Sequence, residues 1–397
     1  MLLPERLEGA VYGHLCGDAL GVPYEFKSAS AIGEVEWRGF GTHSLPPGTW
    51  SDDGALMLAL LDSLLEAGFD TEDQGRRAVA WYDTGRYAVG GEVFDVGNST
   101  IVALQALRSG ISSEEAGDVQ AKGNGSLMRI LPLALVFRDA TDAELLDMAF
   151  RASRVTHGSA EAQIACGLYV LIARRLLMGQ RPEPALESAR SVLRAHLESH
   201  GLPGSKEAAP PAEALAELDS FETWSGRSGR GRVVDSFWSA WDAFTGATDY
   251  RAAVVAAVEY GNDTDTTAAI AGGLAGTHFG VESVPASWRR GLRDRHIAQM
   301  FADRLVGTDD SEFGGTPWST SSAHPLRVDL MDIEGSAPGP TTITSGEYPL
   351  VTEVYAVLPS GSAGDSTAQM LRDLLLTDEG QTIIERSGYV PLPLQRR

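Results

Sequence analysis

The chain has 397 residues, of which 43% are hydrophobic, so it can bury a large core, and its length is compatible with two domains. Its formal net charge of −22 argues against nucleic acid as the main partner, because contacts to phosphate backbones require clustered Lys and Arg. The same charge disfavours an anionic substrate unless metal ions or helix N-termini offset the repulsion locally.

Neither a signal peptide nor a membrane span is expected. Glu5, Arg6 and Glu8 interrupt the N-terminus early, where a signal peptide would have a basic flank followed by an apolar stretch. No stretch approaches the uninterrupted apolar length of a membrane span. The two cysteines, Cys16 and Cys166, are typical of a reducing compartment without a disulfide framework. We therefore predict a cytoplasmic protein with no membrane partner, and we expect it to be a monomer.

Leu, Ala and Met recur at helical spacing through the first three quarters of the chain, where convincing alternating strands are absent. This pattern predicts an all-α fold, a compact multi-helix domain covering residues 1–307. A polar excursion with Pro and Gly at 201–232 is expected to be a surface loop with a short helix in AEALAEL. The predicted helices span 3–20, 54–67, 74–82, 98–108, 126–137, 142–153, 159–178, 183–197, 234–244, 250–259, 267–279 and 286–306.

The composition changes after Gly307. Residues 308–346 are rich in Gly, Ser, Thr and Pro and lack helical periodicity, which predicts a linker. Residues 347–397 begin with the β-branched and aromatic run YPLVTEVYAVL, which predicts a strand. Two short amphipathic helices are expected to follow, in 368–387. We expect this tail to be a small α/β appendage, too short to build a large core alone.

Two acidic turns far apart in the sequence stand out. Each combines hydroxyl and carboxylate oxygens, which suit a hard cation such as Mg²⁺, and each precedes a run that predicts a buried helix. Capping is the alternative for both turns, because Ser and Asp favour helix N-caps and first turns. Burying four carboxylates without cations would be very costly, so either they are solvated or metal is present. The candidate ligands are Ser51, Asp52 and Asp53 in the first turn and Asp263, Asp265 and Thr266 in the second.

Four further loops carry candidate functional groups. Glu25 follows the glycines of GDALGVPYE, and Asp95 lies in FDVGNST before a helix. The glycine-rich turn at 123–129 (GNGSLMR) has backbone N–H groups that could hold a phosphate, although a tight turn with Ser126 as a cap explains it equally well. His157 precedes another helix, where a cap or a satisfied polar residue is the commoner role.

Taken in order, these stretches resemble the ADP-ribosylglycohydrolase family. The matching segments are GDALGVPYE, WSDDGALMLAL, FDVGNST, GNGSLMRILPLAL, THGSAEA and YGNDTDTTAAIAGGLAG, which span residue 1 to about residue 307. The resemblance implies an all-α fold with two Mg²⁺ ions, or Mn²⁺, at the base of a cleft. It also implies hydrolysis of the bond between the ADP-ribose C1″ and an acceptor, which is an ADP-ribosylated protein side chain or an ADP-ribosyl small molecule.

The resemblance assigns roles by position. The six residues of the two acidic turns match the metal ligands, and Glu25 and Asp95 match alternative acid/base residues, between which the sequence does not decide. Two departures are visible, Ser51 where Thr is commoner and Gly54 where many members have a second Thr. No expected carboxylate is missing, which argues against a degenerate member. The residues matching the substrate-binding positions are Gly123, Asn124, Gly125, Ser126, Met128 and His157.

Two other functions fit the same residues. One is a non-catalytic ADP-ribose-binding protein, which the intact acid set disfavours. The other is a hydrolase of a non-protein ADP-ribosyl metabolite or a nucleobase adduct. The acceptor linkage stays open among arginine, serine, O-acetyl and nucleobase, because surface loops would read it.

The tail carries a second resemblance. Its last fifty or so residues, including YPLVTEVYAVLPSG and MLRDLLLTDEGQTIIERSGYVPL, look like the C-terminal end of phosphate-type periplasmic substrate-binding proteins. The remainder of both lobes of such a protein is absent, so we expect no independent phosphate site.

Overall fold

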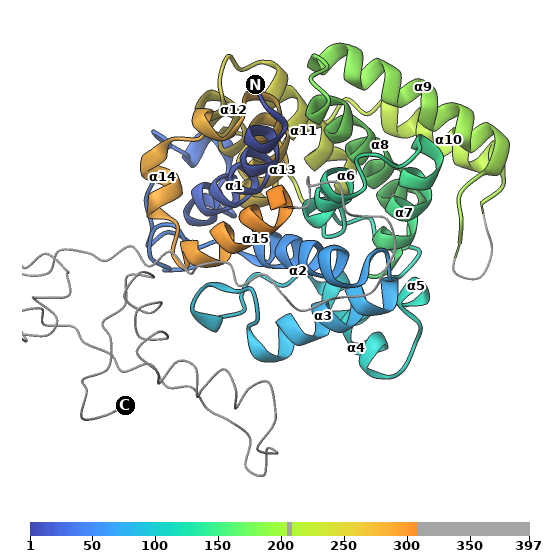
Figure 1. Ribbon diagram of the computed structural model, residues 1–397, viewed down its shortest axis with the longest axis horizontal. Coiled ribbons are helices and arrows are strands. Elements are labelled where there is room, and N and C mark those ends of the chain that lie inside the picture. The colour runs from blue at the N-terminus through green and yellow to red at the C-terminus, as the bar shows by residue number, and fades with distance from the viewer. Residues whose placement is uncertain (205–208, 308–397) are drawn as a thin grey trace, which may run out of the picture. The chain divides into compact units, whose positions relative to one another are not determined.

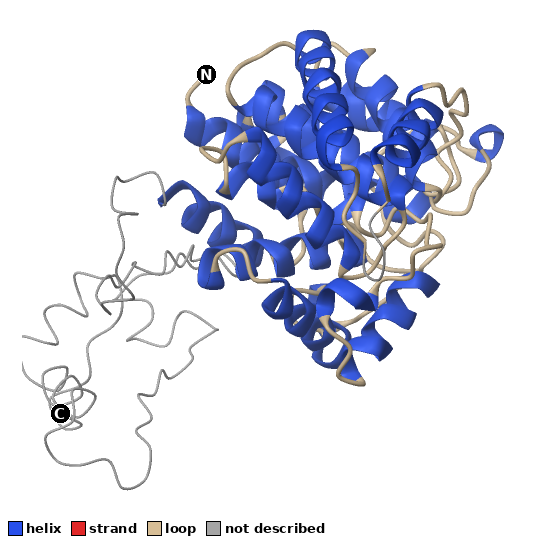
Figure 2. Ribbon diagram, turned by 90° about the vertical axis from the view of Figure 1, so that its right-hand side faces the viewer, coloured by secondary structure: helices blue, strands red, loops and turns tan. Residues whose placement is uncertain are grey.

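The computed structural model describes residues 1–204 and 209–307, all of which belong to one compact unit, Met1–Glu312. Within these ranges the chain forms α-helices and short 3₁₀ helices joined by loops, with four isolated β-bridges and no sheet (Figure 2). The predicted all-α class is therefore confirmed for this part. The expected linker at 308–346 and α/β appendage at 347–397 lie outside the described residues and stay predictions.

Figure 1 labels the α-helices. They are α1 (Leu3–Gly21), α2 (Asp52–Ala67), α3 (Thr71–Thr84), α4 (Asn98–Arg108), α5 (Ser113–Ala116), α6 (Pro132–Val136), α7 (Asp142–Arg154), α8 (Ala160–Leu177), α9 (Pro182–His200), α10 (Pro211–Glu222), α11 (Val233–Thr245), α12 (Tyr250–Glu259), α13 (Thr264–Phe279), α14 (Ala286–Gly291) and α15 (Arg295–Gly307). The 3₁₀ helices are η1 (Val22–Tyr24), η2 (Ala29–Ala31), η3 (Val89–Gly91), η4 (Leu127–Arg129) and η5 (Val281–Ser283).

Most predicted helices are present, and α10 confirms the short helix expected in the polar excursion. Two predictions were wrong. The helix expected over 126–137 is the 3₁₀ helix η4 followed by the separate α6, because Pro132 lacks an N–H donor and starts a new helix. The helix expected over 286–306 is broken into α14 and α15 at Leu292–Asp294, where Asp294 has a φ of 47°.

The core is built around helices that are buried on nearly every face, above all α1, α2, α8 and α13. Such helices are apolar all round because each is enclosed by other helices. The most closely packed pair of helices is α1 and α13, which run antiparallel. Gly9 lies against Gly276, Gly13 against Gly272, and Gly17 against Ala268.

The absence of side chains allows this close approach. A Cβ atom added to Gly276 would lie 1.9 Å from the carbonyl oxygen of Gly9, and one added to Gly17 would lie 2.2 Å from that of Ala268. At the end of the stripe, a Cβ on Gly21 would lie 2.3 Å from the Cα of Asp265. The glycines therefore bring the C-terminus of α1 directly against the acidic turn that opens α13.

A buried carboxylate joins α2, α3 and α15. Asp62 on α2 accepts hydrogen bonds from Arg77, from Tyr87 (Oη to Oδ2, 2.6 Å) and from Arg304 on α15 (Nη1 to Oδ1, 2.8 Å). Burial alone raises the pKa of Asp62, but the hydrogen bonds from Tyr87 and Arg304 and the charge of Arg77 outweigh it, so the pKa lies below its usual value.

The Asp62→Ala variant is expected to lose about 3 kcal/mol of unfolding free energy, because several buried donors lose their acceptor. A carboxylate with a lowered folded-state pKa stabilises the protein above its unfolded value near pH 4 and loses that contribution as the pH falls through the folded-state pKa. Urea titrations at pH 7 and pH 3 should therefore show a smaller difference between variant and wild type at the lower pH. The control is Asp83→Ala, which removes a half-exposed pair with Arg108 and should cost about 0.5 kcal/mol. A pH-independent difference for Asp62 would contradict this account.

Candidate active site and metal centre

The two acidic turns meet in space. Thr266 donates a hydrogen bond to Asp53 across 213 residues of sequence (Oγ1 to Oδ2, 3.2 Å). Asp53 lies in the first turn of α2, and Thr266 lies in the first turn of α13. The structure therefore brings the two acidic turns together. The role of their residues as metal ligands is a separate question.

Asp18, which the sequence interpretation left without a role, holds the first turn in place. Its carboxylate accepts hydrogen bonds from the backbone N–H groups of Ser51 (2.9 Å to Oδ1) and Gly54 (2.7 Å to Oδ2). Asp18 is fully buried near the end of α1, and burial raises its pKa to about 7. One turn of α1 thus binds the N-terminus of α2, while Gly21 contacts the N-terminus of α13. The available signal was a carboxylate among the otherwise uncharged residues of the C-terminal part of α1.

Capping explains one turn in part and the other hardly at all. The Ser51 hydroxyl accepts a hydrogen bond from the backbone N–H of Asp53, as an N-cap does. Asp263 occupies the N-cap position of α13 but makes no side-chain capping bond. Asp265 accepts a bond from the N–H of Thr266 through Oδ1 alone. The two acidic turns therefore contain more carboxylate oxygens than helix capping uses.

Two carboxylate oxygens in this cluster have no hydrogen-bond partner among the described residues, although they are buried. They are Oδ1 of Asp53 and Oδ2 of Asp265, in side chains that are 1% and 0% exposed. A buried, unpaired carboxylate oxygen costs several kcal/mol unless a cation or proton satisfies it. Burial, and then the neighbouring acids, raise the pKa of both residues far above the usual value.

The residues present therefore fit a divalent cation. The donor atoms are carboxylate and hydroxyl oxygens, which hard ions such as Mg²⁺ and Mn²⁺ prefer. Glu25, Asp263 and Asp265 each offer an oxygen within 4.8 Å of the others. A cation among these oxygens would relieve the repulsion that otherwise holds their pKa values up.

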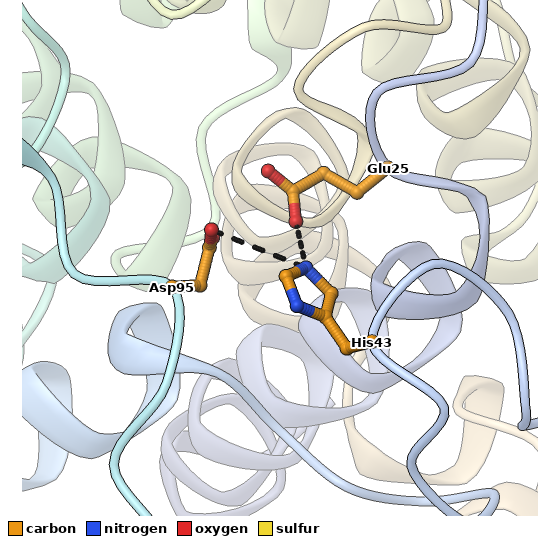
Figure 3. A group of neighbouring side chains, drawn as sticks. All are labelled: Glu25, His43 and Asp95. Carbon is orange, nitrogen blue, oxygen red and sulfur yellow. Dashed lines mark hydrogen bonds and ion pairs between the residues drawn. The ribbon is translucent and has the colours of Figure 1, made fainter.

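Glu25 and Asp95 both approach the same ring nitrogen of a histidine, His43, that the sequence interpretation missed (Figure 3). The Nε2 atom of His43 is 2.5 Å from Oε2 of Glu25 and 4.0 Å from Oδ1 of Asp95. Burial and the nearby charges of Asp95 and Asp263 raise the pKa of Glu25 to about 10. Burial and the charge of Asp263 raise that of Asp95 to about 7. Both acid/base candidates thus face one place.

The glycine-rich turn is connected to the acidic cluster through Asn124. Its side-chain amide donates to Oδ2 of Asp263 (2.8 Å) and to Oγ of Ser236 (2.9 Å). The Ser126 hydroxyl is fully buried and bonded to Ser153 (2.9 Å), and it caps no helix, so its side chain faces the interior. Any contact from Ser126 to a substrate would have to use its backbone. Met128 is buried beside this turn.

His157 lies beneath the same turn. A Cβ atom added to Gly125 would be 2.7 Å from the His157 imidazole, and one added to Gly123 would be 3.3 Å from its Nε2. The other ring nitrogen, Nδ1, contacts the Thr156 hydroxyl at 2.9 Å. Burial, with the charge of Arg129, lowers the pKa of His157 to about 3, so the imidazole is neutral. His157 does not cap α8, because Ser159 does.

The loop between α10 and α11 contacts the site. It belongs to the stretch at 201–232 that was predicted to be a polar surface excursion. The Gly229 carbonyl accepts from the N–H of Asp263 (2.8 Å), and the Gly231 carbonyl accepts from that of Asn124 (3.1 Å). The Ser228 carbonyl accepts from the Asn262 side chain (2.8 Å). A Cβ on Gly231 would lie 3.0 Å from Oδ2 of Asp263. This loop therefore fastens the metal-ligand candidates to the glycine-rich turn.

Comparison with known proteins identifies the class. The sequence model of the ADP-ribosylglycohydrolase family matches residues 2–313, so the chain belongs to this family and is an enzyme of the ADP-ribosylglycohydrolase class. It is 31% identical over 314 residues to the ADP-ribosylarginine hydrolase Tri1 of Pseudomonas putida, covering 77% of this chain and 80% of that protein. It is 27% identical to the ADP-ribosyl-[dinitrogen reductase] glycohydrolase of Rhodospirillum rubrum, covering 72% and 89%.

A solved structure also supports membership of this family. The chain superposes on a protein described as an ADP-ribosylglycohydrolase-related protein complex with a TM-score of 0.63 and 33% sequence identity, over 77% of this chain and 98% of that one. The family resemblance inferred from the ordered motifs is thereby confirmed. Among the described residues, none of the helices has the length and apolar character needed to cross a bilayer.

Proposed function

We propose that this chain is a Mg²⁺-dependent hydrolase that cleaves the C1″ glycosidic bond of ADP-ribosyl conjugates. The observation that carries the proposal is that the two acidic turns meet and hold two buried carboxylate oxygens, on Asp53 and Asp265, that have no partner among the described residues. We assign the metal-ligand role to Ser51, Asp52, Asp53, Asp263, Asp265 and Thr266. Two divalent ions held there would supply positive charge near the anomeric carbon and lower the pKa of a bound water.

The residues of the chain have separate tasks in this proposal. Glu25 or Asp95, both facing the acidic cluster, transfers a proton to the leaving group or from the attacking water. Asn124 fixes Asp263 through its amide. Water exclusion follows from the burial of Asp52, Asp53 and Asp265.

The pyrophosphate is proposed to lie on the glycine-rich turn. Gly123 and Gly125 let the turn pack directly on the His157 imidazole, which a side chain at either position would press against. The N–H groups of such a turn can bind an anion despite the overall charge of −22. His157, being neutral, offers a hydrogen bond without a charge. The substrate-binding assignment therefore covers Gly123, Asn124, Gly125, Ser126, Met128 and His157.

Release of ADP-ribose from defined conjugates tests the proposal. Purified protein with Mg²⁺ is expected to release ADP-ribose from at least one of the arginine-, serine-, O-acetyl- or nucleobase-linked conjugates, and EDTA should abolish the release. The arginine conjugate is the first to assay, because the relative from Pseudomonas putida is described as an ADP-ribosylarginine hydrolase. Binding of ADP-ribose without release from any conjugate would contradict the proposal and favour a non-catalytic binding protein.

A further inference from the structure

A tight loop at residues 40–45 delivers His43 to Glu25. Phe40 and Ser44 both have φ near 55°, and the Phe40 N–H donates to the Leu45 carbonyl at 2.6 Å. A Cβ on Gly41 would lie 1.9 Å from the carbonyl oxygen of Pro23, so the loop packs against the segment that leads to Glu25. A non-glycine residue at positive φ costs energy that the surrounding structure must offset, and such strain concentrates at functional sites.

The loop holds Glu25 at two points. Thr42 donates from Oγ1 to the Glu25 backbone carbonyl at 2.6 Å, and Nε2 of His43 lies 2.5 Å from Oε2 of its carboxylate. Glu25 is only 3% exposed. The His43 ring lies beside Phe26 and Phe94, with ring centroids 5.8 Å and 5.1 Å away. These contacts orient the ring, and its nitrogen orients the carboxylate.

Glu25 lies between two sets of neighbours. One of its oxygens lies within 4.8 Å of ligand atoms of His43 and Asp95, and one lies within 4.8 Å of oxygens of Asp263 and Asp265 (Figure 3 shows the first group). A glutamate side chain without a fixed partner would sample several rotamers, in which these distances differ. The His43 contact favours the rotamer that keeps Glu25 near both sets.

We propose that His43 is a positioning residue that holds the Glu25 carboxylate in place between Asp95 and the oxygens of Asp263 and Asp265. This inference rests on the proposed hydrolase function, and it makes Glu25 the carboxylate on which the alignment of this site depends. His43 acts through Glu25 and needs no contact with the substrate. Its removal should lower kcat more than it weakens substrate binding.

Two substitutions separate the hydrogen bond from the packing. His43→Phe keeps a ring between Phe26 and Phe94 but removes the nitrogen, and His43→Gln keeps a polar group but removes the ring. With the conjugate that the wild type cleaves, His43→Phe should lower kcat by roughly 10- to 100-fold, with KM changed by less than about two-fold. The thermal midpoint should stay unchanged. His43→Gln should recover part of kcat. The matched control is His196→Phe on α9, a half-buried histidine beside Phe150, which should keep full activity.

A double-mutant cycle with Glu25→Gln tests the route of action. If His43 acts through Glu25, adding His43→Phe to Glu25→Gln should cause no further loss of kcat. Two results would overturn this inference and leave the proposed function intact. One is a further loss of kcat in the double variant as large as the loss in His43→Phe by itself. The other is full activity of His43→Phe while Glu25→Gln is impaired. A drop in Mn²⁺ bound per chain in His43→Phe would also overturn it, because His43 would then be a ligand. Full activity of Glu25→Gln would instead contradict the proposed role of Glu25.

Discussion

The Asp265→Asn variant is expected to lose Mg²⁺-dependent turnover by about 1,000-fold or more, while the protein without metal stays at least as stable as the wild type. Loss of a ligand removes charge stabilisation worth several kcal/mol at the reacting carbon. Asp265 is fully buried, close to Asp53 and Asp263, and its Oδ2 has no hydrogen-bond partner in the described part of the chain. Replacing that carboxylate by an amide relieves repulsion in the apo protein.

Thermal unfolding in EDTA and in Mg²⁺ measures this directly. The wild type should gain stability with Mg²⁺ by RT ln(1 + [Mg²⁺]/Kd), and the variant should gain much less. The matched control is Asp249→Asn at the exposed N-cap of α12, which lies outside the site. Asparagine and aspartate are equally good N-cap residues, so this change should have little effect. An Asp265→Asn variant that unfolds more easily in EDTA and also turns over normally would show that Asp265 has a structural role.

The Gly276→Ala variant is expected to lose about 3 kcal/mol or more of unfolding free energy, although alanine is the better helix former by about 1 kcal/mol. The added Cβ would lie 1.9 Å from the Gly9 carbonyl oxygen, a backbone atom that cannot move alone, so α1 and α13 must separate. Turnover should fall as well, because α1 leads into the segment that bears Glu25 and α13 bears Asp265. Urea denaturation measures the stability loss.

Gly33→Ala is the control for that experiment. No atom lies within 4 Å of a Cβ added at Gly33, so its stability should change by no more than about 0.5 kcal/mol. If Gly276→Ala is as stable as the wild type, the close antiparallel packing of α1 on α13 would be wrong.

The sequence alone indicated the helical class and the two acidic turns, because both depend on local pattern. Helical periodicity marks buried helices wherever they pack, and an acidic turn before an apolar run is visible without a fold. Capping explains little of the turn at 261–267, because Thr266 bonds to Asp53 and Oδ2 of Asp265 has no partner among the described residues.

Asp18 and His43 could not have been predicted in the same way. Asp18 acts on N–H groups more than thirty residues away, and that pairing exists only after α1 and α2 have packed. His43 reaches Glu25 because two residues of its loop, Phe40 and Ser44, adopt positive φ. Neither Phe nor Ser is a residue type that predicts this conformation. The helix break at Leu292–Asp294 also depends on a tertiary contact, because the Arg293 N–H donates a hydrogen bond to the Gly48 carbonyl at 2.9 Å.

The number of divalent ions bound per chain tests the central claim most directly. Purified wild-type protein, stripped with EDTA and equilibrated with Mn²⁺, should bind two ions per chain by elemental analysis, and Asp265→Asn should bind fewer. These ions should be required for release of ADP-ribose. Retention of full turnover by the stripped protein, with no ion bound, would contradict the account of the acidic turns as a metal centre.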